Sequence, residues 1–283
     1  MEALRNIARD FAYQFRLKGG LSARLLCVAL YYGAYVAARL AGLSQGASRL
    51  RALGLTGRLG FSLRPVVVRV EEGLVFELDV LAACFVAKEV LHDLTYEHDP
   101  AFRPRPGWTV LDVGAHQGLF SVHAARLVGP QGRVISIEAF PGNAARLRGN
   151  IARNGLGNVV VVEAAAAEKE GRADLHINIL VSGGQSLVYD NADYRGVVSV
   201  PLTTVDGRLA ELGVGRVDLV KIDVEGAAHR VLDGAPRLLA SRPRLVMEIE
   251  GGAAELNEMR DRLRGLGYVV NSVSNILYAA PAS

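Results

Sequence analysis

The chain has 283 residues, of which 50% are hydrophobic and 22% are charged. This length accommodates one large domain and a smaller addition, and the composition is that of a folded globular protein. The two cysteines, Cys27 and Cys84, form no disulfide framework and have no metal-ligand spacing, so we expect a reduced, cytoplasmic compartment.

The net charge of +3 is unevenly distributed along the chain. Residues 1–64 hold ten Arg or Lys and two acids, a net charge of +8, and the remainder carries −5. Within this basic segment, residues 25–38 form a run of 14 uncharged residues with apolar side chains at helical spacing. The run is shorter than the roughly 20 apolar residues that span a bilayer, so it predicts no transmembrane helix. We favour a helical cap packed on the main domain over an interfacial or substrate-capping helix with a basic rim.

The spacing of apolar residues changes from helical to strand-like at Pro65, where a second segment, 65–107, begins. Two apolar runs around Glu-Glu-Gly predict a β-hairpin over 66–78, and a helix is predicted over about 81–94. The prolines at the end of the segment cannot continue a helix and predict a linker into the main domain, residues 108–283.

Four polar residues near the end of that helix resemble metal ligands: His92, Asp93, Glu97 and His98. A zinc site would need a second ligand group at the right spacing, and the sequence has none. We therefore interpret them as solvated residues at a helix end.

Thr109 to Val113 is a short continuous apolar run, typical of a buried parallel strand. It leads into a D-x-G-x-x-x-G pattern of Asp112, Gly114 and Gly118, in which the glycines allow a tight turn and close approach to a ligand. A dinucleotide site would require G-x-G-x-x-G. The carboxylate before the first glycine suits a cation better than a pyrophosphate, and S-adenosylmethionine carries a positive sulfur and an ammonium group.

A second acid, Glu138, ends the next predicted strand, 133–138. It lies 26 residues after Asp112, near the distance at which α/β nucleotide folds place a ribose-binding acid. The alternatives are a turn or cap role for Asp112 and a solvated strand end for Glu138. The two spacings together favour a cofactor site.

Strands and helices then alternate, which predicts a doubly wound parallel sheet with right-handed crossovers. The predicted strands are 109–113, 133–138, 158–163, 217–222 and 244–249, and the predicted helices are 119–127, 142–154, 227–239 and 253–265. Residues 268–278 predict a closing antiparallel hairpin. Between 172 and 204, additional or extended strands flank a polar loop at 182–186, which is either a plain turn or a mobile loop that faces a ligand.

Three ionisable residues alternate at the end of predicted strand 217–222: Lys221, Asp223 and Glu225. Open α/β sheets bind ligands at this edge, so the acids are candidates for a base or an orienting group. In the alternative interpretation, Lys221 and one acid form a structural ion pair while the other acid caps the next helix.

Several motifs together resemble the FkbM family of class I S-adenosylmethionine-dependent methyltransferases. They are DVGAHQG, IEAFP, TTVD, VDLVKIDVEGAAHRVLDGA and RPRLVMEIE, from about Trp108 to Glu250. The resemblance implies a Rossmann-like seven-stranded sheet with the last strand antiparallel, preceded by the N-terminal helical and β-hairpin addition. Residues 1–64 and the last 30 residues lie outside the resemblance.

The resemblance also implies roles for individual residues. Asp112 and Gly114 lie at the methionine end of the cofactor, Glu138 on its ribose and Asp223 beside the reactive methyl group. We assign four further residues to cofactor binding: His116, Gly118, Ala139 and Ala165. Three positions depart from the family pattern: His116, where Asn is usual; Ala139, in an EPxP-like segment; and His229, where an acid is frequent.

We predict methylation of a hydroxyl group on a small-molecule natural product or a saccharide, with Asp223 as orienting group or base; Glu225 or a histidine, His116 or His229, are the other candidate bases. N-methylation of a peptide or amide and a non-catalytic Rossmann-like binding protein are the alternatives. A divalent metal is not expected, although Asp223 and Glu225 could contribute ligands. Nucleic acid is not an expected partner, because the basic segment lacks interleaved aromatic and basic residues. Peripheral membrane contact through that segment and a homodimer are compatible with the sequence.

Overall fold

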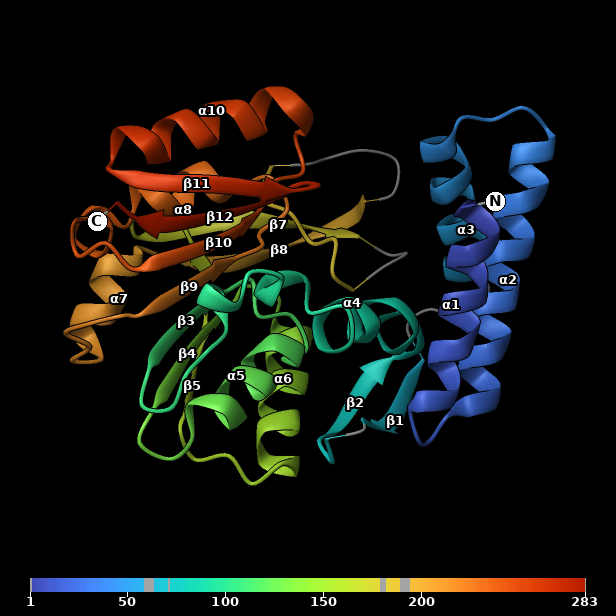
Figure 1. Ribbon diagram of the computed structural model, residues 1–283, viewed down its shortest axis with the longest axis horizontal. Coiled ribbons are helices and arrows are strands. Elements are labelled where there is room, and N and C mark those ends of the chain that lie inside the picture. The colour runs from blue at the N-terminus through green and yellow to red at the C-terminus, as the bar shows by residue number, and fades with distance from the viewer. Residues whose placement is uncertain (1, 59–63, 71, 179–181, 189–193, 283) are drawn as a thin grey trace. The chain divides into compact units, whose positions relative to one another are not determined.

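The computed structural model describes residues 2–58, 64–70, 72–178, 182–188 and 194–282 (Figure 1). The chain divides into two compact units. The first contains residues 1–93, 178–184 and 191–195, and the second contains residues 94–177, 185–190 and 196–283. The predicted helical segment and hairpin therefore belong to one unit, and the predicted sheet belongs to the other.

The first unit is built from helices and one hairpin. Its helices are α1 (Glu2–Arg16), α2 (Leu21–Leu40), α3 (Gln45–Arg58), the π-helix η1 (Ala82–Val86) and α4 (Ala87–Leu91). Strands β1 (Pro65–Arg69) and β2 (Val75–Asp79) pair antiparallel, which confirms the predicted hairpin. The predicted helix 81–94 is present as η1 and α4, but it ends at Leu91. Leu94 has a φ of 52°, which is incompatible with a continuing right-handed helix.

Helix α2 contains the predicted apolar run. One side of it packs inside its own unit, where Cys27 and Val28 join Cys84 in an apolar cluster. The helix has 20 residues and a mean hydropathy of 1.4 in its most apolar window, so by length and composition alone it could cross a membrane. The helix is longer than the apolar run on which the prediction rested, and the absence of a transmembrane helix stays a prediction. That run comprised only the residues between Arg24 and Arg39, whereas both arginines lie inside the helix.

The second unit is organised around a seven-stranded sheet. Its strands are β3 (Thr109–Val113), β4 (Arg133–Glu138), β5 (Val159–Glu163), β9 (Leu219–Ile222), β10 (Arg244–Glu248), β11 (Tyr268–Val273) and β12 (Ile276–Pro281). The spatial order is β11-β12-β10-β9-β3-β4-β5. β12 runs antiparallel to both β10 and β11, and the other neighbouring pairs are parallel. This arrangement confirms the predicted Rossmann-like sheet with an antiparallel last strand.

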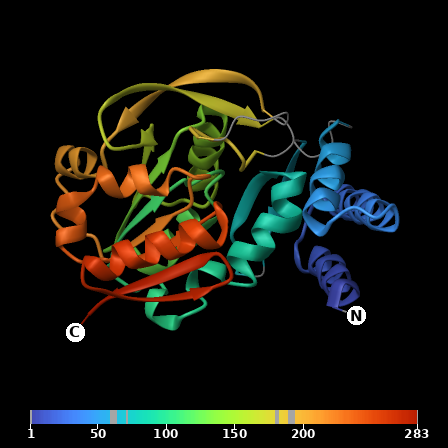
Figure 2. The same cartoon turned by 90° about the horizontal axis from the view of Figure 1, so that it is seen from above.

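Helices cover both faces of this sheet. α5 (Leu119–Val128) and α6 (Pro141–Arg153) pack on β4 and β5. The apolar core of the opposite face includes side chains from α7 (Val205–Glu211), α8 (Ala228–Asp233), α9 (Pro236–Ala240) and α10 (Gly252–Gly265). Figure 2 shows α10 beside the β11–β12 hairpin, in line with its packing on β11.

One predicted helix is two helices in the structure. The segment 227–239 breaks between α8 and α9, because Pro236 has no N–H group and begins the second helix. Just before the break, the backbone at Gly234 approaches Ala167 so closely that a Cβ atom there would lie 2.0 Å from the Ala167 carbonyl oxygen. The break therefore accommodates a close crossing of two backbone segments.

The strands predicted between 172 and 204 form a separate small sheet. β6 (Ala165–Ala166), β7 (Gly171–Asn178) and β8 (Tyr194–Thr203) have the order β6-β8-β7. They are additional strands and do not extend the main sheet. Two short 3-10 helices, η2 (Thr95–Glu97) and η3 (Pro100–Phe102), precede β3.

Candidate functional site

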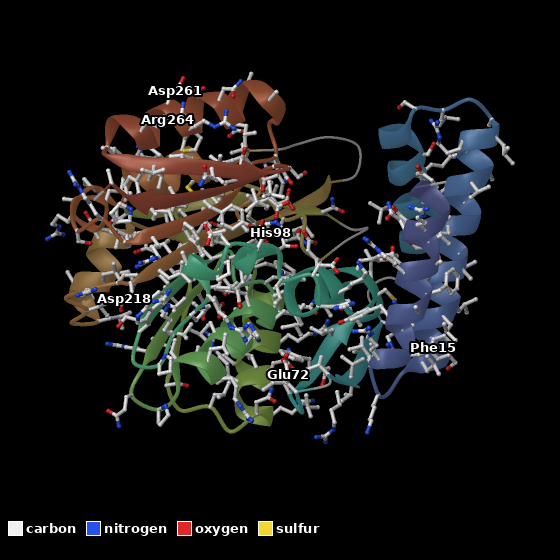
Figure 3. The ribbon with its side chains drawn as sticks, in the orientation of Figure 1. Phe15, Glu72, His98, Asp218, Asp261 and Arg264 are labelled. Atoms are coloured by element: carbon white, nitrogen blue, oxygen red, sulfur yellow. The ribbon has the colours of Figure 1, made fainter. Side chains whose placement is uncertain are left out.

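The carboxyl ends of β3, β4, β9 and β10 meet at one edge of the main sheet, the edge where open α/β sheets bind ligands. Asp112 on β3 lies in register with Lys221 on β9. Asp218, labelled in Figure 3, marks the opposite end of β9, where its carboxylate accepts a hydrogen bond from the Thr109 N–H. Lys221 therefore lies in β9 near its carboxyl end, and Asp223 and Glu225 come directly after the strand, at the ligand-binding edge.

Lys221 ties two strand ends together beneath this edge. Its ammonium group is buried, donates to the Gly114 carbonyl at 2.7 Å and lies 3.1 Å from Asp112 Oδ1 and 3.5 Å from Asp223 Oδ2. Burial lowers the pKa of Lys221, but Asp112 and Asp223 together raise it above its ordinary value. The structural ion pair of the alternative interpretation is thus present, formed by the buried, charged Lys221 with Asp112 and Asp223.

Asp112 is fully buried, and its contacts are made inside the protein. Ser121 Oγ on α5 donates to Asp112 Oδ2 at 2.5 Å, and Lys221 neutralises the other oxygen. The carboxylate therefore supports the Gly114 carbonyl through Lys221. Its described contacts are with Ser121 and Lys221, and its role in cofactor binding stays a prediction.

The loop between β3 and α5 alternates positive φ angles. They are 78° at Gly114, 52° at His116 and 91° at Gly118. A Cβ atom on Gly114 would lie 1.7 Å from the Asp223 carbonyl oxygen, so only glycine fits there. His and Asn are among the residues that most readily adopt the left-handed conformation. The His116 departure from the family pattern therefore preserves the backbone geometry of the loop.

Glu138 holds this loop against the end of β4. Its Oε2 accepts the His116 N–H at 2.7 Å, and its Oε1 accepts the Phe140 N–H at 2.8 Å. Burial raises the pKa of Glu138 to about 7 in spite of these two donors, the nearby Lys221 charge and a hydrogen bond from the Asn143 side chain. A carboxylate has about four acceptor sites, so a further hydroxyl donor, such as one of a ribose, would stabilise the ionised form.

Four acids gather at the ends of β9 and β10: Asp223, Glu225, Glu248 and Glu250. Burial, followed by repulsion from neighbouring carboxylates, raises the pKa of Glu225 to about 8, and burial and Asp223 raise that of Glu250 to about 8. Burial and Asp223 also raise the pKa of Glu248. The Asp223 side chain is 30% exposed. This concentration of acid groups favours a ligand that brings positive charge or hydrogen-bond donors.

Tyr96 joins two of these acids and was not predicted from the sequence. Its hydroxyl group donates to Asp223 Oδ2 at 2.9 Å or to Glu248 Oε2 at 3.2 Å, and its ring centroid lies 5.2 Å from Lys221 Nζ. Asn275 donates to the other oxygen of Glu248 at 3.0 Å. Glu248 and Glu250 alternate at a strand end as Asp223 and Glu225 do, and that pattern could have identified them. Tyr96 has no such signal, because it lies 127 residues from Asp223.

The polar loop at 182–186 reaches this group at its last residue. Ser186 is buried, its backbone pairs with that of His176, and its Oγ donates to the Glu225 carbonyl at 2.8 Å. Ser186 therefore anchors the loop next to the acids. Residues 189–193, which follow this loop, lie outside the described residues.

Three other predicted site residues, His229, Ala139 and Ala165, make none of the polar contacts described above. His229 on α8 has its Nε2 atom 3.9 Å from Glu255 Oε1 on α10, and no contact described for it reaches Asp223. Ala165 in β6 and Ala139 after β4 belong to the same apolar cluster, which also contains Phe140. The two alanines could contribute an apolar wall, whereas the described contacts of His229 give it no role in proton transfer.

The interpretation of Glu97 as a solvated residue was wrong. Its carboxylate is buried, and its Oε1 lies 2.8 Å from His123 Nε2 on α5. His92, Asp93 and His98 are exposed, as predicted. The difference arises because the short helix η2 places Glu97 against α5, a contact between segments that local sequence does not specify.

The residues at this edge fit a cationic cofactor with a ribose. Glu138 has spare acceptor capacity, the glycine loop offers backbone groups, and the acids after β9 and β10 lack a compensating cation other than Lys221 in the described part of the chain. Among the described residues, no group of three or more His, Cys, Asp or Glu side chains could hold a metal ion.

Comparisons with known proteins agree with this chemistry. The model of the methyltransferase FkbM domain matches residues 112–270, more than half of the chain. The 31-O-demethyl-FK506 methyltransferase FkbM of Streptomyces tacrolimicus is 27% identical over 228 residues, which cover 70% of this chain and 86% of that protein. The 2-O-methyltransferase NoeI of Sinorhizobium fredii is 26% identical over 149 residues, covering 48% and 60%.

A third relative is much longer than this chain. The AMB antimetabolite synthetase AmbE of Pseudomonas aeruginosa is 29% identical over 227 residues, which cover 66% of this chain but only 11% of that protein. The shared part corresponds to one region of AmbE. The family match, the strand order and the glycine loop with its flanking acids lead to one conclusion: the chain belongs to the FkbM family of S-adenosylmethionine-dependent methyltransferases.

Proposed function

We propose that this methyltransferase acts on a hydroxyl group of a small-molecule natural product or a saccharide. Two of the relatives carry an oxygen position in their names, 31-O-demethyl-FK506 for FkbM and 2-O for NoeI. The observation that carries the proposal is the partly exposed Asp223 carboxylate within hydrogen-bond distance of the buried Tyr96 hydroxyl. A hydroxyl acceptor needs a group that orients it and takes its proton, and Asp223 has the exposure and the fixed position for this role.

The neighbouring acids leave Asp223 as the preferred base. In the protein without cofactor, Glu225 and Glu250, each with a pKa of about 8, retain their protons at neutral pH. Asp223 is the acid that the Tyr96 hydroxyl group and Lys221 both contact, and they hold it from the protein side. When bound, S-adenosylmethionine supplies an electrophilic methyl group on a positively charged sulfur. Asp223 would hold the acceptor oxygen in line with that methyl group, and most of the acceleration would come from this positioning.

The residues of the β3 and β4 ends would hold the cofactor. We propose that Glu138 accepts hydrogen bonds from the ribose hydroxyl groups, in addition to those from the His116 and Phe140 N–H groups. The backbone of the Gly114–Gly118 loop would hold the methionine end. Asp112 would act on this loop through Lys221, which donates to the Gly114 carbonyl.

Replacement of Asp223 by Asn tests the proposal. We expect turnover to fall by about 10²–10⁴-fold, because the amide cannot take a proton, while cofactor affinity changes by only a few fold. Turnover of acceptor hydroxyl compounds is followed by mass spectrometry, and affinity by calorimetry. Asp261→Asn is the matched control, because Asp261 lies exposed on α10.

Two outcomes would contradict the proposed role. Full turnover of Asp223→Asn with normal cofactor affinity would exclude Asp223 as base and orienting group. Product masses that place the methyl group on nitrogen would exclude O-methylation while leaving the family assignment intact.

A further inference from the structure

The N-terminal helices carry positive charge on their surface. Arg5, Arg9, Lys18, Arg39 and Arg51 are exposed. The acids of residues 1–64 are Glu2 and Asp10 alone. Asp10 is half-buried, accepts a hydrogen bond from Tyr32 and lies 3.6 Å from Lys88 Nζ. Its negative charge is therefore compensated inside the first unit. The exposed described surface of these helices is therefore basic.

Helix α2 also presents an apolar stripe to solvent. The stripe has exposed residues at helical spacing along five turns, with no charge among them: Leu26, Ala29, Gly33, Val36 and Leu40, with Ser22 and Ala37 at its margin. Leu26 is 49% exposed and Leu40 is 85% exposed. Phe15 on α1, labelled in Figure 3, is 67% exposed, and Leu55 on α3 is also exposed. Large apolar side chains thus reach solvent from all three helices.

The opposite side of α2 is committed to protein contacts. Arg24, Cys27 and Val28 are fully buried within the first unit, and the Arg24 guanidinium group donates to the Leu17 carbonyl at 2.8 Å and to Gln14 Oε1. A helix that spans a bilayer with this face toward lipid would place Arg24 in hydrocarbon. The helix is therefore suited to lie along a surface with one apolar side inward and one outward.

We propose that α1–α3 dock this enzyme on an anionic phospholipid membrane, with the exposed stripe of α2 inserted at the level of the headgroups. The exposed basic side chains of α1–α3 complement the negative charge of such a surface, and each adds attraction within a Debye length. The inference is independent of the proposed acceptor, because it uses only residues of the first unit.

Co-sedimentation of the full chain with lipid vesicles tests the proposal. We expect binding to vesicles of phosphatidylcholine mixed with phosphatidylglycerol, little binding to phosphatidylcholine alone, and release at high salt. Val36→Glu with Leu40→Glu should weaken binding by about tenfold or more, because charge then replaces the inserted apolar groups. Arg5→Gln with Arg9→Gln should weaken it by roughly tenfold as well.

Val269→Glu is the matched control, since Val269 on β11 is also an exposed apolar residue and belongs to the second unit. Its vesicle binding should equal that of the unchanged protein. Because all substituted residues are exposed, circular dichroism and cofactor affinity should be unchanged in every variant. Absence of binding to anionic vesicles would overturn the proposal. Binding that resists high salt and alkaline extraction would also overturn it, in favour of a spanning helix, and so would equal loss in the Val269 control.

Discussion

At the scale of single residues, Tyr96 is the most informative side chain of the site. Its hydroxyl group has one proton and two carboxylate neighbours, so it can donate a hydrogen bond to Asp223 or to Glu248, but not to both at once. Its hydrogen bond lowers the pKa of Glu248, which burial raises. The ring also packs edge-on against Phe120 and lies over Lys221. The hydroxyl group is therefore the part of Tyr96 that acts on the acids.

Tyr96→Phe should lower turnover by about tenfold, because Asp223 loses the donor that fixes its orientation. The pKa of Glu248 should rise further, because this carboxylate also loses the Tyr96 hydrogen bond. Stability should fall by only about 1 kcal/mol, since the ring and its contacts remain. Turnover across pH, together with urea unfolding, measures both effects.

Tyr278→Phe is a close control. Tyr278 also donates a buried hydrogen bond, to the Thr95 carbonyl, but it touches none of the four acids in the described contacts. It should lose a similar amount of stability and retain turnover. Equal loss of turnover in both variants would mean that Tyr96 acts only through folding.

At the scale of secondary-structure elements, one buried side chain joins β3 to β9 where both strands end. Lys221 contacts Asp112 across the strand pair and the Gly114 carbonyl in the following loop. Both charged groups are almost completely buried, so each depends on the other for compensation. The geometry of the cofactor loop thus depends on an ion pair inside the sheet.

Lys221→Met should destabilise the protein by about 3–5 kcal/mol, because Asp112 would remain as an uncompensated buried charge. Adding Asp112→Asn should restore part of this loss, and the two changes should be strongly non-additive in urea unfolding. Arg230→Met provides the comparison at the surface, where the pair with Glu168 is half-exposed and should contribute less than about 1 kcal/mol. Additive effects of the Lys221 and Asp112 changes would contradict the proposed tie.

At the scale of the whole molecule, the acids of the site link proton binding to stability and to cofactor binding. Glu138, Glu225 and Glu250 have pKa values of about 7, 8 and 8 in the folded protein, above the ordinary value of 4.5. Between pH 4.5 and about pH 8 the folded state therefore binds more protons at these three groups than the unfolded state. The contribution of these groups to stability therefore falls as pH rises from about 4.5 to about 8 and is constant above that range.

A cationic cofactor should reverse this penalty. Its positive sulfur would favour the ionised carboxylates, so binding of S-adenosylmethionine should release protons, and its affinity should rise from about pH 6 to about pH 8.5. Calorimetry in buffers with different heats of ionisation counts the protons. S-adenosylhomocysteine, whose sulfur is neutral, should release fewer. If the affinity for both compounds is independent of pH, the protonation of these acids does not change when the cofactor binds, which would contradict the prediction.

The order of residues along the chain is enough to specify the main sheet and the edge at which chemistry occurs. Apolar runs of strand length alternate with helical patterns, and this periodicity is local, so it places β3, β4, β9 and β10 within a few residues. Residues at the carboxyl ends of parallel strands, or directly after them, must gather at one edge of the sheet. Asp112, Glu138 and Asp223 can therefore be assigned to that edge from their positions in the chain alone.

The partners of these acids depend instead on tertiary packing. Tyr96 reaches Asp223 across 127 residues of sequence, and Lys221 reaches the Gly114 carbonyl across 107. Glu97 is buried for the same reason, since its partner His123 lies on a different helix. Periodicity specifies which face of an element is buried but not which side chain lies opposite it. Contacts between distant segments, and the pKa shifts that they produce, are therefore set by how the whole chain packs.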